Sequence, residues 1–383
     1  MPKSENQWKI IFEWFHRHPE VGYKEVQTTE KIRSILLEEG IEILPTGLKT
    51  GLIGIIRGGL PGKSICLRAD IDGLPIEEKT GLPYRSENPG NMHACGHDFH
   101  ITTALYIGSL LQQQKQKLHG NIYLAFQPAE EVIGGADELL STGLLDEVEE
   151  FYGFHGEPSL EAGQVSIESG SVMGAVDQFA VVVTGKGCHG AAPHLGKNPI
   201  LPLVSIVNQI QAFGAEKTNP LNPKVISITH VAGGETWNVI PDSAFLEGTV
   251  RSMNPADREV IEKTIRRIVK TQGEMAEVQT QVSWHHGPAA VINDKDLSQA
   301  ARTICAAGKL ELVSLLPAML GDDFSRYTEK IKKAKGLYIK VGTGFGPPLH
   351  SPLFTVDPAA IRPAAEFYAK FLGTRLSADV HSW

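Results

Sequence analysis

An eight-residue segment at positions 93–100 carries a high density of side chains that bind metals. It consists of His93-Ala94-Cys95-Gly96-His97-Asp98-Phe99-His100. Thiolate, imidazole and carboxylate together suit Zn²⁺ and, less selectively, Mn²⁺, Co²⁺ or Ni²⁺. A buried free thiol beside a surface histidine would explain Cys95 and His97 alone. The other donors in the segment favour a metal site.

Further candidate ligands lie later in the chain. The pair Glu130-Glu131 follows Gln127-Pro128-Ala129, His155 stands alone, and His350 follows two prolines and a leucine. Taken separately, the glutamates would ordinarily be solvated charges at a helix start, and each histidine would ordinarily be structural. Taken together, they supply a hydrolytic site in which one glutamate binds metal while its neighbour moves protons.

Size and composition limit the class of protein. With 383 residues the chain exceeds a single core, and 42% hydrophobic with 21% charged residues is typical of soluble globular proteins. No apolar run approaches the roughly 18 residues of a membrane span. The net charge of −8 argues against a nucleic-acid partner. We therefore expect two domains, no membrane association and no nucleic acid.

The start of the chain and its cysteines predict the compartment. The first residues are polar and lead into a charged amphipathic segment, unlike the apolar region of a signal peptide. The four cysteines, Cys66, Cys95, Cys188 and Cys305, are widely separated, which suits a reducing compartment. We expect a cytoplasmic protein. A redox pair of Cys95 with Cys188 is an alternative, although nothing in the sequence brings the two thiols together.

The first part of the chain alternates between helical and strand-like patterns. Two helices are predicted to open it, the second stopping at Gly40. Strands are then predicted at 52–56, 64–68, 121–126 and 151–154, with helical stretches at 102–112 and 136–140. This alternation indicates an α/β fold with a mostly parallel sheet covered by helices. Candidate site residues follow its strands, and sites in such sheets form at the carboxyl ends.

From about residue 177 the pattern changes. Strands are predicted at 178–184, 224–231, 244–251 and 278–285, and helices at 199–213 and 257–272, which is enough for a four-stranded sheet with two helices. Patterns at 296–307, 337–341 and 358–372 then return to the first type. We therefore predict an inserted α+β domain at 176–286 within a catalytic domain formed by 1–175 and 287–383.

Four ordered motifs resemble a known superfamily. They are Arg68-Ala69-Asp70-Ile71-Asp72-Gly73-Leu74-Pro75, His93-Ala94-Cys95-Gly96-His97-Asp98, Phe126-Gln127-Pro128-Ala129-Glu130-Glu131 and Gly185-Lys186-Gly187-Cys188-His189-Gly190. In order and spacing the chain resembles the two-metal aminoacylase and carboxypeptidase superfamily of zinc peptidases. The likeness is closest to its amidohydrolase branch, which includes hippurate hydrolase, N-acyl-L-amino acid amidohydrolase and N-acetyldiaminopimelate deacetylase.

The resemblance assigns roles to individual residues. It implies two divalent ions per subunit, Zn²⁺ or Mn²⁺ with Co²⁺ or Ni²⁺ as alternatives, held by Cys95, His97, Glu131, His155 and His350. It makes Glu130 the general base and acid. By the same likeness Asp70 is the supporting aspartate that orients a ligand. Asp72 could match that residue instead.

For the inserted domain, the resemblance implies a lid that also pairs two subunits. His189 would enter the partner's site and stabilise the oxyanion, while Asn238 and Arg251 would hold the substrate carboxylate. A solvated charge at a strand end is the alternative for Arg251. We therefore expect a homodimer formed through the inserted domain.

The predicted activity is hydrolysis of the amide bond of small N-acyl amino acids, of the N-acetyl or N-benzoyl type, by metal-activated water. A dipeptidase or carboxypeptidase on the same scaffold is one alternative, because it attacks an amide beside a free carboxylate. A non-catalytic metal-binding module is another. Glu130 is not needed merely to hold metal, and its presence counts against that module.

Overall fold

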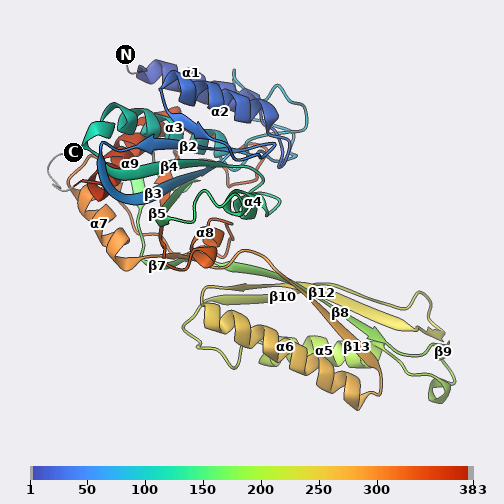
Figure 1. Cartoon of the computed structure of the whole chain (residues 1–383). Helices are drawn as coiled ribbons and strands as arrows, with labels where there is room; N and C mark the ends of the chain where they lie inside the picture. The colour runs from blue at the N-terminus through green and yellow to red at the C-terminus, as the bar shows by residue number, and fades with distance from the viewer. Residues whose placement is uncertain (1–2, 378–383) are drawn as a thin grey trace. The chain divides into compact units, whose positions relative to one another are not determined.

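The structure, a computed structural model, describes residues 3–377 and divides into two compact units (Figure 1). The first unit consists of residues up to Gly170, of Ile292–Leu316 and of residues from Asp323 onward. The second consists of Ser171–Val291 and Pro317–Asp322. The segment 176–286, predicted as an insertion, falls within the second unit.

The first unit is built on an eight-stranded sheet with the order β1-β2-β4-β3-β5-β16-β6-β15. In chain order its strands are β1 (Glu42–Leu44), β2 (Leu52–Arg57), β3 (Leu60–Asp70), β4 (His119–Gln127), β5 (Val148–Glu157), β6 (Gln164–Ser166), β15 (Glu311–Leu312) and β16 (Lys335–Gly342). The four central strands β4, β3, β5 and β16 are parallel to one another, whereas β2 runs antiparallel to β4 and β6 antiparallel to β16. The prediction of a mostly parallel sheet is confirmed.

Helices pack over this sheet and share its core. They are α1 (Glu5–Arg17), α2 (Val26–Glu38), α3 (His97–Gln113), α4 (Gly135–Ser141), α7 (Lys295–Ala306), α8 (Ser325–Lys330) and α9 (Ile361–Arg375), with short 3₁₀ turns η1 (Lys115–Lys117) and η3 (Pro358–Ala360). Ser4 and Gln7 form a capping box that starts α1. Trp8, Phe12 and Phe15 follow at helical spacing and are buried. This amphipathic pattern fixes α1 against a large hydrophobic core of the unit.

The second unit is an antiparallel sheet with two helices. Its four strands have the order β10-β12-β8-β13. Its elements are β7 (Gly170–Met173), β8 (Ala175–Thr184), β9 (Cys188–His189), η2 (Pro193–Leu195), α5 (Ile200–Phe213), β10 (Lys224–Gly233), β11 (Val239–Ile240), β12 (Ser243–Ser252), α6 (Pro255–Met275) and β13 (Gln279–His286), and the short strand β14 (Val291–Asn293) begins at the last residue of its main segment. β8 and β10 both run antiparallel to β12, so α5 connects two parallel strands with a third between them. This α+β arrangement agrees with the predicted four strands and two helices.

No helix in the part of the chain that the structure describes combines the length and apolarity needed to cross a membrane. The expected cytoplasmic residence stays a prediction.

A buried histidine ties the first helix to the start of α3. His16 Nδ1 lies 2.6 Å from Asp98 Oδ2, and its Nε2 lies 3.3 Å from Glu78 Oε1. Burial by itself lowers the pKa of His16, but the two carboxylates outweigh it and raise the pKa to about 9. His16 is therefore a buried cation that links α1, the loop carrying Glu78 and the helix that carries His97.

We predict that the contribution of His16 to stability depends on pH. Because its pKa is raised on folding, the contribution is complete below about pH 6.5 and is lost as the pH rises through about 9. Urea unfolding should show His16→Gln less stable than the wild type by about 3 kcal/mol at pH 6. The difference should shrink by pH 9.5. An equal difference at both pH values would contradict the charged state of His16.

Candidate metal centre

The candidate ligands gather where parallel strands end. Asp70, the last residue of β3, lies beside Gln127, the last residue of β4. His155 lies near the end of the parallel strand β5. Parallel strands present their carboxyl ends at one edge of the sheet, so side chains from separate parts of the sequence converge there.

His97 is the first residue of α3 and is held from one side. Gly96 before it has a φ of 83°, a left-handed conformation that suits glycine, and turns the chain between Cys95 and His97. The Nδ1 of His97 donates to the backbone oxygen of Asp72 at 2.9 Å and lies 3.2 Å from Asp72 Oδ1. Its Nε2 is buried and has no hydrogen-bond partner within residues 3–377. The free nitrogen is therefore available to a metal.

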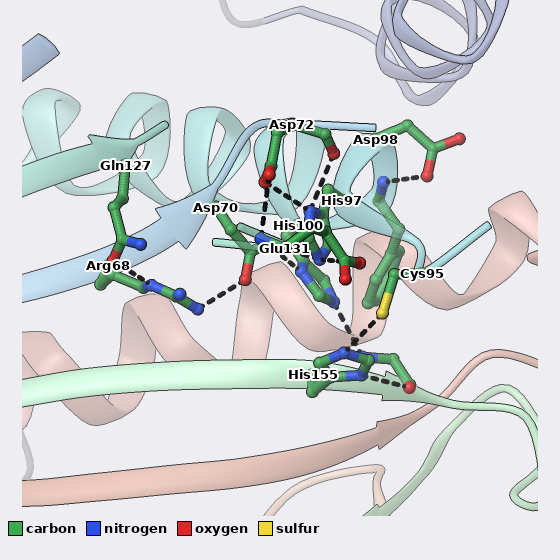
Figure 2. Close-up of polar contacts among 12 residues, drawn as sticks. Arg68, Asp70, Asp72, Cys95, His97, Asp98, His100, Gln127, Glu131 and His155 are labelled. Atoms are coloured by element: carbon green, nitrogen blue, oxygen red, sulfur yellow. Dashed lines mark hydrogen bonds and ion pairs between the residues drawn. The ribbon is translucent and has the colours of Figure 1, made fainter. Parts of the chain in front are cut away.

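Cys95 and His155 form a second donor pair (Figure 2). The Sγ of Cys95 lies 3.4 Å from His155 Nε2. His155 Nδ1 donates to the backbone oxygen of Gly156 at 2.7 Å, which directs Nε2 towards the thiol. Burial, reinforced by Lys340, holds the pKa of His155 well below its usual value. His155 is thus a neutral imidazole, the form that binds metals.

Glu131 and His350 complete the set. Glu131 Oε1 is buried without a hydrogen-bond partner among the described residues, and it lies 3.8 Å from His97 Nε2 and 3.5 Å from His350 Nε2. The backbone N–H of Glu131 donates to Asp72 Oδ2 at 3.0 Å. The backbone N–H of His350 donates to the oxygen of Ala94 at 2.8 Å, which fixes its loop beside Cys95.

These donors fit metal ions. Donor atoms of three residues lie within 4.8 Å of one another in each of three overlapping sets, namely Cys95–His97–His155, Cys95–Glu131–His350 and His97–Glu130–Glu131. Cys95, His97 and Glu131 each belong to two of these sets, as expected where neighbouring ions share a cluster of ligands, and His97 also belongs to a further set with Asp70 and His100. Two buried atoms that lack hydrogen bonds, His97 Nε2 and Glu131 Oε1, face this space. A bound cation would satisfy both.

Loading the cluster must displace protons. Burial raises the pKa of the Cys95 thiol. Burial alone would lower the pKa of His97, but Asp70 and Asp72 outweigh it and hold that pKa well above its usual value. Metals bind the deprotonated forms of both groups, so binding at this cluster competes with protons.

Asp70 contacts residues that support the ligands, namely Arg68 and His100. It accepts from Arg68 Nη1 at 2.5 Å, and its Oδ1 lies 2.5 Å from His100 Nδ1. His100 Nε2 in turn accepts from the backbone N–H of Gly156 at 2.9 Å, beside His155. Burial raises the pKa of Asp70, but Arg68, His97 and His100 outweigh it and hold that pKa well below its usual value. Asp70 is an ionised anchor for His100.

The geometry therefore favours Asp72 over Asp70 as the aspartate that orients His97. Asp72 contacts the Nδ1 of His97 and the backbone of Glu131, whereas the nearest Asp70 oxygen is 3.7 Å from His97 Nε2. We expected Asp70 in that role and kept Asp72 as the alternative. Figure 2 shows Asp72 on one side of His97 and the Cys95–His155 pair on the other.

Two histidines of the 93–100 segment, His93 and His100, received no role from the sequence, and they differ in the structure. Both nitrogens of His100 are engaged in hydrogen bonds, to Asp70 and to the N–H of Gly156, which favours a supporting role over that of a ligand. Its spacing of three residues from His97, on one helix face, was the available indication. His93 is buried, neither of its ring nitrogens has a partner among the described residues, and it belongs to none of the donor sets.

The remaining predicted residues lie in the second unit. His189 is exposed in β9 and pairs with Val239 of β11, while the backbone N–H of Gly190 donates to the oxygen of Asn238 at 2.8 Å. His189 and Asn238 are thus neighbours. Arg251 lies near the end of β12, is partly buried, and has a pKa lowered by that burial.

Comparison with known proteins gives concordant results. The sequence model of peptidase family M20/M25/M40 matches residues 66–374. The chain is 39% identical to an N-acetyl-L-cysteine deacetylase of Bacillus subtilis over 92% of its length and 84% of that relative. It is 35% identical to thermostable carboxypeptidase 1 of Saccharolobus solfataricus over 96% of both chains. A crystal structure from Bacillus subtilis, described as a dinuclear metal binding peptidase of the M20 family, superposes with a TM-score of 0.87 at 35% identity, covering 97% of this chain and 98% of that one.

We predict that the two aspartates differ in what their loss affects. Asp72→Ala should weaken metal affinity roughly 10–100-fold, because His97 loses its contact with the Asp72 carboxylate and the N–H of Glu131 loses its acceptor, while only the backbone oxygen of Asp72 remains to hold His97. Asp70→Ala should instead lower the free energy of unfolding of the metal-free protein by about 3 kcal/mol, because it leaves Arg68 partly uncompensated. Equilibrium dialysis and urea unfolding measure the two effects. The reverse pattern would return the orienting role to Asp70.

Proposed function

The chain belongs to peptidase family M20/M25/M40, and from that premise we propose that it is a metal-dependent amidohydrolase that cleaves the amide bond of N-acyl amino acids. One observation carries the proposal. Thiol, imidazole and carboxylate donors from four segments converge on one space, with a second glutamate beside them. A module that only stored metal would not need Glu130. The activity is therefore that of a hydrolase acting on amide bonds.

We infer that two divalent ions are held by Cys95, His97, Glu131, His155 and His350. The mixture of thiolate, imidazole and carboxylate suits Zn²⁺ or Mn²⁺, with Co²⁺ and Ni²⁺ as alternatives. The relative described as a dinuclear metal binding peptidase supports the number of ions. Asp72 and the backbone oxygen of Gly156 orient His97 and His155 by binding their Nδ1 atoms.

Glu130 is the residue we assign to proton transfer. When bound, divalent ions in such sites lower the pKa of water and polarise the scissile carbonyl. The Glu130 carboxylate, within 4.8 Å of donor atoms of His97 and Glu131, accepts the proton of the attacking water. It then gives that proton to the leaving amine, which departs as the free amino acid.

The substrate class rests on the relatives. A deacetylase of N-acetyl-L-cysteine is 39% identical and supports an acyl amino acid as substrate. A carboxypeptidase is 35% identical and supports the second candidate, cleavage of a C-terminal peptide bond. The two differ in the product that accompanies the amino acid: a simple carboxylic acid from an acyl amino acid, or a peptide or second amino acid from a peptide.

We predict that Glu130→Gln retains its metal and loses turnover. The metal-loaded wild type should release amine from N-acetyl or N-benzoyl amino acids faster than from dipeptides. The variant should lower kcat roughly 10²–10⁴-fold, because the amide of glutamine cannot take the proton. Amine release over a substrate panel, with metal content measured in parallel, tests both statements. Wild-type turnover of dipeptides alone would favour the peptidase activity, and full activity of the variant would remove Glu130 from its role.

We also infer that the active form is a homodimer paired through the second unit. Arg251 pairs with Val176 at one end of the sheet, whereas β9 with His189 follows the other end of β8. Ser243, which pairs with Thr184 at the end of β8 that leads to β9, lies eight residue steps from Arg251 along β12, or about 26 Å at the usual rise. A small substrate cannot bridge that distance, so one chain cannot offer both residues to one site. We assign His189 and its neighbour Asn238 to the partner's site and Arg251 to the site of its own subunit, so that Asn238 and Arg251 hold the substrate carboxylate from different subunits.

The edge of the second unit supports this pairing. β10 lies at the edge of its sheet and exposes apolar side chains, including Val225 at 40% and Val231 at 52%. Exposed edge strands of this length are templates for pairing with another chain unless they are protected. A second copy of the same strand across a two-fold axis would cover it.

Subunit mixing tests the shared site. His189→Ala and Arg251→Ala homodimers should each be inactive. If His189 acts in trans and Arg251 in cis, their heterodimer holds one intact site. An equimolar mixture that has exchanged subunits should therefore recover about a quarter of wild-type activity. Absence of recovery, with exchange confirmed by mass spectrometry, would mean that both residues serve the same subunit or neither serves catalysis.

A further inference from the structure

The turn that carries Glu130 is held in an unfavourable backbone conformation. Ala129 has a φ of 53° and Ile133 a φ of 56°, in the left-handed region that non-glycine residues rarely adopt. The backbone N–H of Ile133 donates to the oxygen of Glu130 at 2.9 Å and closes the turn. Such conformations persist only when surrounding structure imposes them, and they cluster at functional sites.

Two carboxylates impose this conformation from different parts of the fold. The backbone N–H of Ala129 donates to Glu25 Oε1 at 2.8 Å. The backbone N–H of Glu131 donates to Asp72 Oδ2 at 3.0 Å. The residues on both sides of Glu130 are therefore anchored, one to the segment before α2 and the other to the segment after β3.

The segment before α2 also packs directly on the turn. Gly22 lies so close that a Cβ there would stand 2.8 Å from Val132 Cγ2 and 3.2 Å from Ala129 Cα. Glu25 itself is fully buried. Thr29 Oγ1 donates to the backbone oxygen of Glu25 at 2.6 Å and accepts from the N–H of Gly51 at 2.9 Å. The anchor is thus itself fixed at the start of α2.

We propose that Glu25 is a positioning residue for Glu130, holding the turn so that the glutamate is presented to the reacting centre. The proposal rests on the role assigned to Glu130 above. Glu25 acts through the backbone of Ala129, and we assign it no contact with the substrate. Because proton transfer requires an approach within hydrogen-bond reach, a displacement of about 1 Å can cost roughly 10²-fold in rate.

Three variants in the full-length metal-loaded enzyme test this role. Glu25→Ala removes the acceptor for the Ala129 N–H. Glu25→Gln keeps an oxygen acceptor, and burial already raises the pKa of Glu25 to about 7, so a neutral amide is a close replacement. Asp294→Ala is the matched control, since Asp294 also accepts backbone N–H groups, at the start of α7 and away from the turn.

Glu25→Ala should lower kcat about 10- to 100-fold with KM changed less than about threefold, because a misplaced base affects the reaction step more than binding. Glu25→Gln should retain kcat within about threefold of the wild type, and Asp294→Ala should lose stability without losing kcat. Metal content should stay at the wild-type level in all three, because Glu131 keeps its bond to Asp72.

Hydrogen exchange of the metal-free protein gives a readout independent of activity. In peptides covering Gln127–Gly134, exchange should accelerate in Glu25→Ala and keep the wild-type rate in Glu25→Gln and Asp294→Ala. Wild-type kcat in Glu25→Ala, equal losses in the alanine and glutamine variants, or unchanged exchange would each overturn the role of Glu25 while leaving the hydrolase proposal intact. A wild type silent on every acyl amino acid and peptide would overturn both.

Discussion

The site depends on two buried polar atoms that face each other without hydrogen bonds to any described residue. His97 Nε2 and Glu131 Oε1 lie 3.8 Å apart, and each such atom costs about 1–3 kcal/mol when it is left unsatisfied. Asp72 fixes both, because it binds His97 through Nδ1 and Glu131 through its backbone N–H. Other charged groups stand near these atoms, His350 Nε2 at 3.5 Å from Glu131 Oε1 and Asp70 Oδ1 at 3.7 Å from His97 Nε2, but none is close enough for a hydrogen bond, and a cation between the two atoms would satisfy both.

The residues that surround the ligands are arranged by a related requirement, because buried charges also need partners. Asp70 must remain charged while fully buried, and Arg68 supplies the compensating charge, with Asp323 on the guanidinium's other side at 2.8 Å. Asp70 also holds His100, which accepts from the N–H of Gly156 and so steadies the strand that carries His155. The buried charges of Arg68, Asp70 and Asp323 are therefore paired, and this network helps to position the ligands.

The sequence predicted the elements well because their patterns are local. Apolar residues at helical spacing located α1, and the change of pattern near residue 177 located the antiparallel sheet of the second unit. The sequence also predicted that the ligands lie close together, because they follow parallel strands whose carboxyl ends meet at one edge of the sheet. The sequence could not choose between Asp70, the last residue of β3, and Asp72, two residues later, because their roles depend on which groups their side chains contact. The bonds from Glu25 to Ala129 and from His16 to Asp98 join residues distant in sequence, and no local pattern indicates them.

The account's central claim is that Cys95, His97, Glu131, His155 and His350 hold two divalent ions. Anomalous diffraction from crystals of the zinc-loaded protein tests it most directly. We expect two peaks among these side chains, with zinc about 2.3 Å from Cys95 Sγ and about 2.0–2.1 Å from the nitrogens of His97 and His155. Peaks at Asp70 and His100 instead, or no peak in fully loaded protein, would contradict the claim.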